Sequence, residues 1–226
     1  SEKLFSARKS NVILQGSSAG VNLDRFTIHN KEAWRKEYRK KFDFSANDCV
    51  FAYVGRITRD KGVNELLAAF EEADIVNKKL LLIGQIESEQ TLDRSLLERA
   101  KNDNRVIFHS PVNDIERYYS AIDILVLPSY REGFGMVVVE AEAMGVPVIV
   151  TDIPGPTDAM IPNETGLLVK KADVDSLVAA MKELARSPEK RQRFGAAAQK
   201  FAAENFEQQH LYQAILQDRK RLLGEE

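Results

Sequence analysis

Short apolar runs alternate with longer amphipathic segments along most of this chain of 226 residues. Runs rich in β-branched and aliphatic residues predict buried strands, and apolar residues at three- and four-residue spacing predict helices. The expected strands are Val12–Gln15, Cys49–Gly55, Lys79–Gly84, Arg105–Phe108, Ile122–Leu127, Pro147–Val150 and Gly166–Val169. The expected helices are Asn30–Lys41 (with Asn30 as its N-cap), Lys61–Ala73, Ser88–Lys101, Asp114–Ala121, Gly135–Gly145, one running from Val174 to Leu184, Pro188–Ala203 and Gln208–Leu223.

Strands that are apolar on both faces and separated by helices indicate a parallel sheet with helices on both faces. The predicted fold is therefore a Rossmann-like α/β domain. In such a sheet a ligand binds at the carboxyl ends of the strands. The loops that follow Gly55, Gly84, Phe108, Leu127 and Val150 are the places to look for chemistry.

Composition narrows the choice of function. The chain has 32 basic and 34 acidic residues, a formal net charge of -2, and 44% hydrophobic residues. This balance argues against a nucleic-acid-binding protein and against disorder. Cys49 is the single cysteine, so the chain forms no internal disulfide or cysteine-based metal cluster, which fits a reducing compartment. The longest apolar stretch, Met136–Val150, contains two glutamates and a proline and is too short to cross a bilayer. A cytoplasmic location is expected.

The loop from Gly55 to Gly62 carries two cations next to a predicted helix start. Arg56 and Lys61 gain nothing from the helix dipole at that end, so an anion between them is favoured, and a phosphate fits. The glycines allow the backbone to approach such a ligand closely. An ordinary solvated loop with two surface cations explains the same residues equally well.

A second loop, within Pro128–Gly145, carries two carboxylates. Glu132 precedes a helix that opens at Gly135, and Glu140 lies on its second turn. The first-turn amides can bind an anionic oxygen, and the two carboxylates suit hydroxyl groups on either side of a diphosphate. Together they point to a sugar nucleotide. The alternatives are a surface carboxylate for Glu140 and a charge that favours the helix dipole for Glu132.

Several motifs follow one another in a fixed order: Gly20–Phe26 (GVNLDRF), Val54–Gly62 (VGRITRDKG), Leu81–Gly84 (LLIG), Glu132–Glu140 (EGFGMVVVE), Gly145–Val148 (GVPV), Thr151–Gly155 (TDIPG) and Thr165–Val169 (TGLLV). In this order they resemble the carboxyl-terminal, donor-binding domain of glycosyltransferase family four. Those enzymes are retaining and have two Rossmann-like domains that face each other across a cleft, the GT-B arrangement. The resemblance runs from about Val12 to Phe206 and is closest to members that build capsular or other surface polysaccharides.

The resemblance implies roles for particular residues. Arg56 and Lys61 match the pair that grips the donor diphosphate, and Glu132 matches the catalytic carboxylate that contacts the donor sugar. Glu140 matches the glutamate that binds the ribose hydroxyls. The loop that ends at Val112 matches the loop whose backbone groups contact the nucleotide base. The other donor-binding residues that it implies are Gly55, Gly133, Phe134, Gly135, Met136 and Val137. Asn22, Gln85 and Asp158 depart from the family's usual residues. These departures do not affect the residues that bind the diphosphate, but the resemblance does not identify the base or the sugar.

The resemblance also implies a missing half. Residues 1–10 match a linker from an amino-terminal acceptor-binding domain, residues 11–206 the nucleotide-sugar-binding domain, and residues 207–226 a closing helix and tail. The implied partners are a nucleotide-sugar donor, preferably a UDP-sugar, and a saccharide or lipid-linked acceptor. The chain alone is expected to be inactive in transfer. A sugar-nucleotide epimerase of similar architecture and a non-catalytic nucleotide-binding module are the alternatives.

Three weaker signals have simpler explanations. Asp173 and Asp175 imitate a metal-binding acidic pair, but an N-cap is the better interpretation of an aspartate at a helix start. No essential metal and no cofactor are expected, because the cations and helix amides supply the positive field. The basic run Lys31–Lys41 is interpreted as a solvated helix face, with contact to an anionic membrane surface, at its inner face, as the alternative. The Gly16–Gly20 segment is interpreted as a turn.

Overall fold

The computed structural model describes residues 16–17, 19–87 and 91–223. Within them six strands form one sheet, and all five strand pairings are parallel. The strands are β1 (Cys49–Val54), β2 (Lys78–Ile83), β3 (Val106–His109), β4 (Ile124–Leu127), β5 (Val148–Thr151) and β6 (Gly166–Val169), in the spatial order β3-β2-β1-β4-β5-β6. The expected strand Val12–Gln15 and the expected linker lie outside the described residues.

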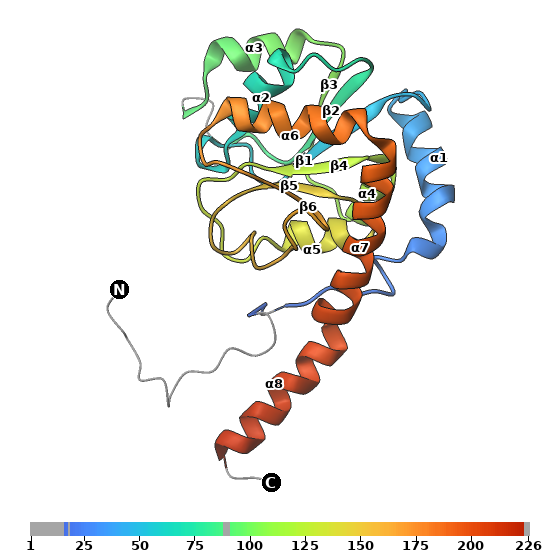
Figure 1. The fold of residues 1–226 in the computed structure, drawn as a ribbon, viewed down its shortest axis with the longest axis vertical. Helices are drawn as coiled ribbons and strands as arrows, with labels where there is room; N and C mark the ends of the chain where they lie inside the picture. The colour runs from blue at the N-terminus through green and yellow to red at the C-terminus, as the bar shows by residue number, and fades with distance from the viewer. Residues whose placement is uncertain (1–15, 18, 88–90, 224–226) are drawn as a thin grey trace.

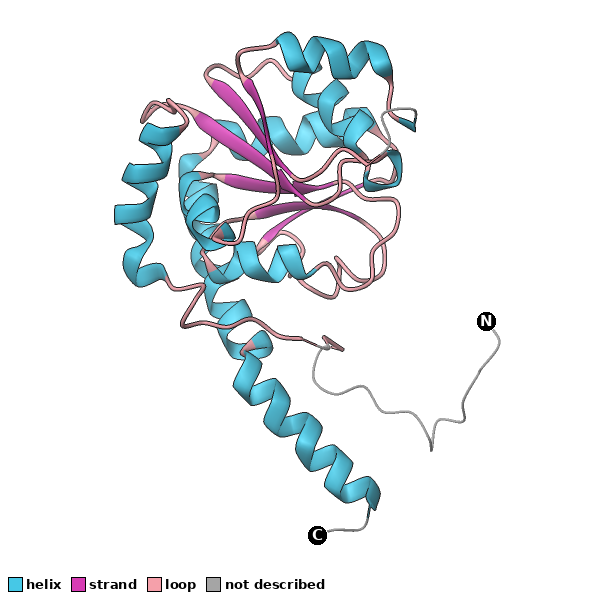
Figure 2. Cartoon of the chain, turned by 180° about the vertical axis from the view of Figure 1, so that it is seen from behind, coloured by secondary structure: helices cyan, strands magenta, loops and turns pink. Residues whose placement is uncertain are grey.

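Helices cover both faces of this sheet, which confirms the predicted fold (Figures 1 and 2). They are α1 (Lys31–Lys41), α2 (Val63–Glu72), α3 (Arg94–Asn102), α4 (Ile115–Ala121), α5 (Met136–Ala143), α6 (Val174–Arg186), α7 (Pro188–Phe206) and α8 (Gln208–Leu223), with short 3-10 turns at Ile28–Asn30 and Arg59–Lys61. Helix α2 packs against α3 and α6, whereas α1 packs against α4, and α5 packs against α7. The central strands β4 and β5 are buried along their whole length, as apolar parallel strands must be.

Two helices begin later than the sequence predicted. Helix α3 begins at Arg94 and not at Ser88, because the Asp93 side chain accepts a hydrogen bond from the Leu96 amide at 3.0 Å and so caps the helix there. Helix α2 begins after Gly62, whose φ of 69° interrupts the helical path. Asn30 is the N-cap of α1, as predicted, although its side chain makes no capping hydrogen bond. The N-cap interpretation of Asp173 is confirmed by its bond to the Ser176 amide, at 2.8 Å.

Lysine and arginine side chains cap the carboxyl ends of four helices at the edge of the sheet where the strands begin. There each side chain donates to backbone carbonyls that have no partner inside a helix. The pairs are Lys78 with the carbonyls of Phe70 and Ala73 at the end of α2, Arg35 with Ser120 and Ile122 after α4, Lys31 with Gly145 after α5, and Arg191 with Leu184 and Ala185 at the end of α6. A cation in this position also interacts favourably with the helix dipole, by about 0.3–1 kcal/mol.

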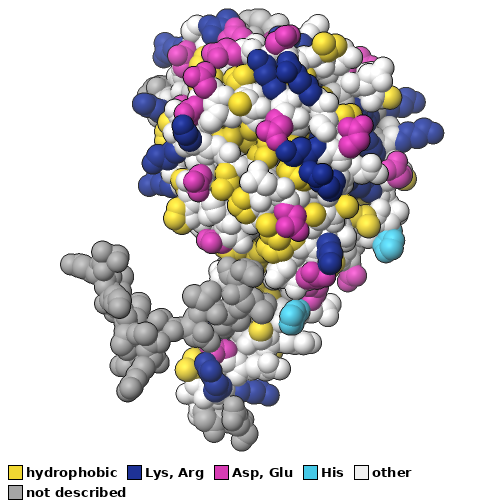
Figure 3. All heavy atoms as spheres, viewed as in Figure 1, with side chains coloured by type: hydrophobic (Ala, Val, Ile, Leu, Met, Phe, Trp, Pro, Cys, Tyr) yellow, Lys and Arg dark blue, Asp and Glu magenta, His cyan; other side chains and the backbone are white. Residues whose placement is uncertain are grey.

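This arrangement corrects the interpretation of the basic run Lys31–Lys41 as a solvated face. Arg39 is buried and donates to the carbonyls of Ala121, at 3.1 Å, and Asp48, at 2.8 Å, and to the Asp123 carboxylate. Charged side chains of both signs are interspersed on the face shown in Figure 3. Much of the basic run therefore serves the packing of α1 on α4.

Helix α8 projects away from the sheet and its helices (Figure 1). It follows directly on α7, and Leu211 is its one buried side chain in the described part. Its exposed large apolar side chains are Tyr212, Leu216, Leu222 and Leu223. Among the described residues no helix combines the length and the apolar character needed to cross a membrane.

Candidate nucleotide-sugar site

The chain reverses its direction of travel across the sheet between β1 and β4. From β1 it moves outward to β2 and β3, and it then returns to β4 on the other side of β1. In a doubly wound sheet the crevice at this switch point, at the carboxyl ends of the strands, is where ligands bind. Because β1 and β4 are neighbours, the loop after Val54 and the loop after Leu127 lie side by side.

Backbone contacts hold these two loops together. The Tyr130 amide donates to the Asp60 carbonyl at 2.9 Å. A side chain on Gly62 would place its Cβ 2.0 Å from the Pro128 carbonyl oxygen, so only glycine allows this approach. The two motifs that the sequence singled out thus form one surface.

A pocket of about 370 Å³ opens at this edge and collects four of the predicted donor-binding residues, Gly55, Arg56, Val112 and Glu140. The rest of its lining is Val54, Ile83, Gly84, Gln85, Glu87, Pro111 and Ile115. A second hollow of about 470 Å³ adjoins it and shares Gly84, Gln85 and Pro111. The walls are mainly apolar, with an arginine and two glutamates, which suits a ligand that has a flat ring and polar substituents.

Glu140 is half-buried at this pocket. The hydroxyl of Tyr119, a fully buried residue, donates to Glu140 Oε2 at 3.1 Å. Burial raises the pKa of the Glu140 carboxyl above its usual value, and the Tyr119 bond opposes that shift. The carboxylate is thus poised to accept hydrogen bonds from hydroxyl groups of a ligand.

Glu132 is held by two donors on one of its oxygens. Lys61 Nζ lies 2.7 Å from Glu132 Oε1, and the buried Ser129 hydroxyl donates to the same atom at 2.8 Å. Both charged side chains are mostly shielded, with 16% and 15% of the Lys61 and Glu132 side chains exposed. The structure therefore places the predicted diphosphate lysine and the predicted catalytic carboxylate in direct contact.

Arg56 is bound differently. It forms an ion pair with Glu87 at 2.8 Å, with 55% and 40% of the two side chains exposed. The sequence predicted that Arg56 and Lys61 have no anionic partner until a ligand binds. In the structure each already pairs with a carboxylate, Glu87 for Arg56 and Glu132 for Lys61. An exposed pair of this kind contributes little to stability, so Arg56 can exchange Glu87 for a phosphate at small cost.

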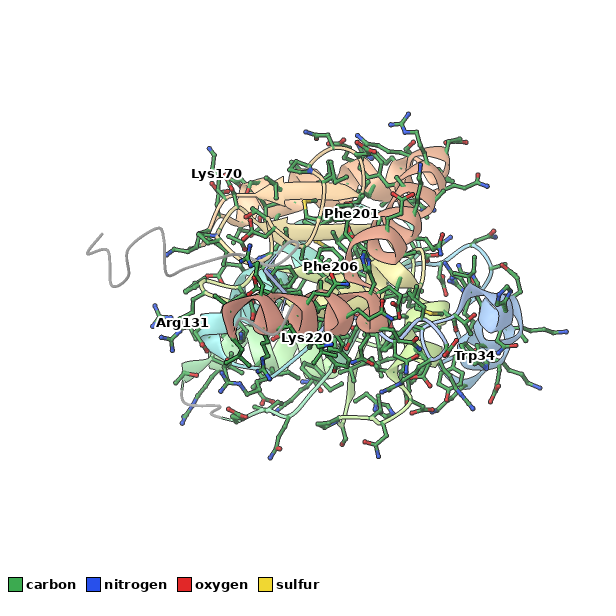
Figure 4. The ribbon with its side chains drawn as sticks, turned by 90° about the horizontal axis from the view of Figure 1, so that it is seen from below. Trp34, Arg131, Lys170, Phe201, Phe206 and Lys220 are labelled. Carbon is green, nitrogen blue, oxygen red and sulfur yellow. The ribbon has the colours of Figure 1, made fainter. Side chains whose placement is uncertain are left out.

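The segment from Gly133 to Val137 leads into α5. Gly135, with a φ of 83°, is the N-cap of this helix and has no side chain to occupy the first-turn amides. Phe134 packs edge-on against Phe206, at 5.6 Å between ring centroids, and Ser17 donates to the Met136 sulfur at 3.4 Å. Figure 4 shows Phe206 at the end of α7, and it places Arg131 and Lys170 at one end of the molecule and Trp34 of α1 at the other. The basic helix α1 thus lies away from these loops.

Sequence reasoning missed three polar residues at the site. Tyr119 and Ser129 hold the two motif glutamates, and Glu87 pairs with Arg56. Ser129 follows the strand directly and stands three residues before Glu132, a spacing that could have suggested a contact. Tyr119 lies in a short helix with no motif around it, and nothing local distinguishes it from a core tyrosine. Among the described residues, no three His, Cys, Asp or Glu side chains cluster as a metal site would require.

Comparisons with known proteins agree on one class. The family model for glycosyl transferases group 1 matches residues 35–201. The chain therefore belongs to the group 1 glycosyltransferase family. It is 33% identical over 215 residues to the capsular polysaccharide biosynthesis glycosyltransferase CapM of Staphylococcus aureus, which covers 94% of this chain and 55% of that protein.

Solved structures give the same fold. A sucrose-phosphate synthase from Thermosynechococcus elongatus superposes with a TM-score of 0.79 at 28% identity, over 92% of this chain and 52% of its own. HepE of Anabaena, solved in complex with UDP, superposes with a TM-score of 0.81 at 22% identity, over 89% of this chain and 56% of its own. Both neighbours share the fold of this chain over most of its length. This chain spans about half the length of these three proteins.

Proposed function

We propose that this chain is the donor-binding half of a retaining glycosyltransferase that transfers a sugar from a nucleotide-sugar, a UDP-sugar by preference, to a saccharide or lipid-linked acceptor in surface polysaccharide synthesis. The observation that carries the proposal is the pocket at the switch point, where Arg56 and Glu140 line one cavity. The similarity to CapM supports the polysaccharide assignment.

In this proposal the diphosphate lies between the Arg56/Lys61 pair and the first turn of α5. As the bond between the sugar and the β-phosphate breaks, negative charge grows on the leaving nucleotide, and these fixed positive groups stabilise it. Glu132 orients the donor sugar or stabilises its cationic character. The acceptor hydroxyl attacks from the same face. No metal is required, because the cations and amides fill that role.

The other half of the enzyme supplies the acceptor site in this proposal. The exposed apolar side chains of α8, Leu216 and Leu222 among them, pack against that half. A lipid-linked acceptor would bring the enzyme to the inner face of the membrane. The packing of α1 on α4 leaves only Lys36, Lys40 and Lys41 of its basic residues exposed, so α1 is a poor membrane anchor.

Calorimetric titration of this chain with UDP, GDP and ADP, with and without magnesium, tests donor binding. We expect saturable binding of UDP that does not depend on the metal and is lost in the Arg56→Ala/Lys61→Ala variant. Preferred binding of GDP or ADP would refute the UDP assignment, and a strict need for magnesium would refute the metal-free site.

The role of Glu132 needs the longer enzyme. We expect Glu132→Gln to lower turnover about 10²- to 10⁴-fold while UDP affinity changes only a few-fold, because the carboxylate acts on the sugar and not on the nucleotide. Glu65→Gln is the matched control, since Glu65 pairs with the Tyr130 hydroxyl outside the pocket. Turnover that survives in Glu132→Gln would refute the assignment of Glu132 as the catalytic carboxylate.

A further inference from the structure

The contact between Tyr119 and Glu140 joins the core to the pocket. Tyr119 is in α4 and is fully buried, with its ring 6.3 Å from that of Phe26. Its hydroxyl is 3.1 Å from Glu140 Oε2 and 3.4 Å from the Val137 carbonyl oxygen. Since a phenol has one proton to give, the nearer and charged carboxylate is the favoured acceptor.

No cation competes for this carboxylate among the described residues. Arg25 lowers the Glu140 pKa through its charge but is bonded elsewhere: its Nε donates to Glu116 at 2.9 Å, and its guanidinium also donates to the Asn113 carbonyl. A phenol orients a carboxylate without neutralising it. The orientation of Glu140 is thereby set from the buried side, and its second oxygen stays available to ligand hydroxyl groups.

We propose that Tyr119 is a positioning residue: it fixes the Glu140 carboxylate so that both hydroxyls of a ribose are recognised, and it thereby sets the preference of the site for ribonucleotides over 2′-deoxyribonucleotides. This inference rests on the proposed function, because it takes Glu140 as the residue that meets the ribose. Without the phenol bond the carboxylate is free to rotate, and ordering it on binding costs rotamer entropy.

The test measures a ratio of affinities and not activity. UDP and 2′-deoxy-UDP are titrated by calorimetry into the wild-type chain and into Tyr119→Phe, which keeps the ring and removes the hydroxyl. We expect the wild type to prefer UDP by about tenfold or more, as for a hydrogen bond to a charged group. In Tyr119→Phe this preference falls below about threefold, and weaker binding of UDP accounts for most of the change.

Tyr38→Phe is the matched control. Tyr38 is also buried and its hydroxyl also donates to a carboxylate, that of Asp114, which does not line the pocket. It should keep the wild-type ratio. A generally loosened fold would weaken both ligands alike and would leave the ratio of the Tyr119→Phe variant unchanged, so the ratio separates positioning from a structural effect.

Glu140→Gln provides a second test, because it changes the acceptor of the same bond. It should lower the ratio itself, and Tyr119→Phe in that background should lower it no further. A wild type that binds UDP but does not prefer it would refute the ribose role of Glu140 and the inference with it. A wild-type ratio that survives in Tyr119→Phe, or a further fall in the double variant, would overturn the role of Tyr119 alone.

Discussion

The two edges of the sheet both carry cations, but they use them in different ways. At the edge where the strands begin, Lys31, Arg35, Lys78 and Arg191 donate to the carbonyls that end four helices. Those acceptors are part of the backbone and cannot leave. At the edge where the strands end, the acceptors are side-chain carboxylates, which can move aside for a ligand.

A charged residue in a sequence does not indicate a function until the group that it binds is known. Backbone carbonyls make a cation structural, because removing the cation leaves several acceptors without a donor. Carboxylates at a pocket make a cation exchangeable, because an anionic ligand offers the same kind of oxygen. Variants at the two edges should therefore separate loss of stability from loss of binding.

The largest effect on stability is expected for Arg39→Met. Arg39 is 7% exposed, and its removal leaves the carbonyls of Ala121, Ser45 and Asp48 without this donor. We expect the free energy of unfolding to fall by about 3 kcal/mol or more, measured by urea denaturation. Lys36→Met, on the exposed side of the same helix, should change it by less than about 0.5 kcal/mol. Equal losses of unfolding free energy in Arg39→Met and Lys36→Met would show that the hydrogen bonds of Arg39 to backbone carbonyls do not stabilise the fold.

Lys61→Met is the intermediate case, since its partner is a carboxylate but the pair is mostly shielded. We expect UDP affinity to fall tenfold or more, because a charge-assisted bond to phosphate is worth about 1.5–3 kcal/mol. Stability should also fall, by about 1 kcal/mol, as Glu132 loses its cation and keeps only Ser129. Calorimetry and urea denaturation on the same sample measure both. Intact UDP binding in Lys61→Met would show that Lys61 pairs with Glu132 and does not bind the diphosphate.

Arg56→Ala should affect binding alone. Its partner Glu87 is exposed, so the free energy of unfolding should stay close to that of the wild type, while UDP affinity falls about tenfold. Arg99→Ala is the matched control: Arg99 forms an equally exposed pair with Glu71, with 52% and 49% of the side chains accessible, outside the pocket. If both variants weaken UDP binding, the effect of Arg56 is one of net charge only.

The sequence predicted the sheet and its ligand edge because both follow from local patterns. Buried parallel strands leave a run of apolar residues, and the carboxyl ends of such strands share an edge. Arg56 and Glu140 were singled out by their loops and Val112 by the family resemblance, and the fold brings all three to one pocket. The bounds of α3 were missed because an aspartate at 93 caps the helix more effectively than the preceding polar residues.

What could not be predicted was pairing between distant side chains. Nothing in the spacing of Lys61 and Glu132 shows that they touch, because the contact depends on β1 and β4 being neighbours. The basic run of α1 was misjudged for the same reason: its partners are carbonyls of the following helices, which a sequence pattern does not display. Tyr119 illustrates the limit, since its role depends on one acceptor oxygen across a helix interface.

The smallest effect is expected at Glu142, which lies two residues beyond Glu140 on α5. Glu140 has a phenol partner and a pocket, whereas Glu142 is fully buried and neither of its oxygens makes a well-formed hydrogen bond with a described residue, although the Thr165 side chain is close enough to oppose the shift of its pKa. Burial raises the pKa of this carboxyl well above its usual value. Its folded-state pKa therefore exceeds its unfolded-state pKa, so its contribution to stability is complete below about pH 4.5 and is lost as the pH rises toward the folded-state pKa.

Glu142→Met removes both unpartnered oxygens and the titration. We expect it to raise the free energy of unfolding at neutral pH by about 1 kcal/mol, with a gain over the wild type that shrinks as the pH falls toward 4.5. Glu142→Gln separates the two causes, because it removes the titration but keeps unpartnered polar atoms in the core. Denaturation curves for the three chains at several pH values measure both. A Met variant less stable than the wild type would show that Glu142 has a partner the contacts do not reveal, and a gain independent of pH would show that desolvation of the charge contributes nothing.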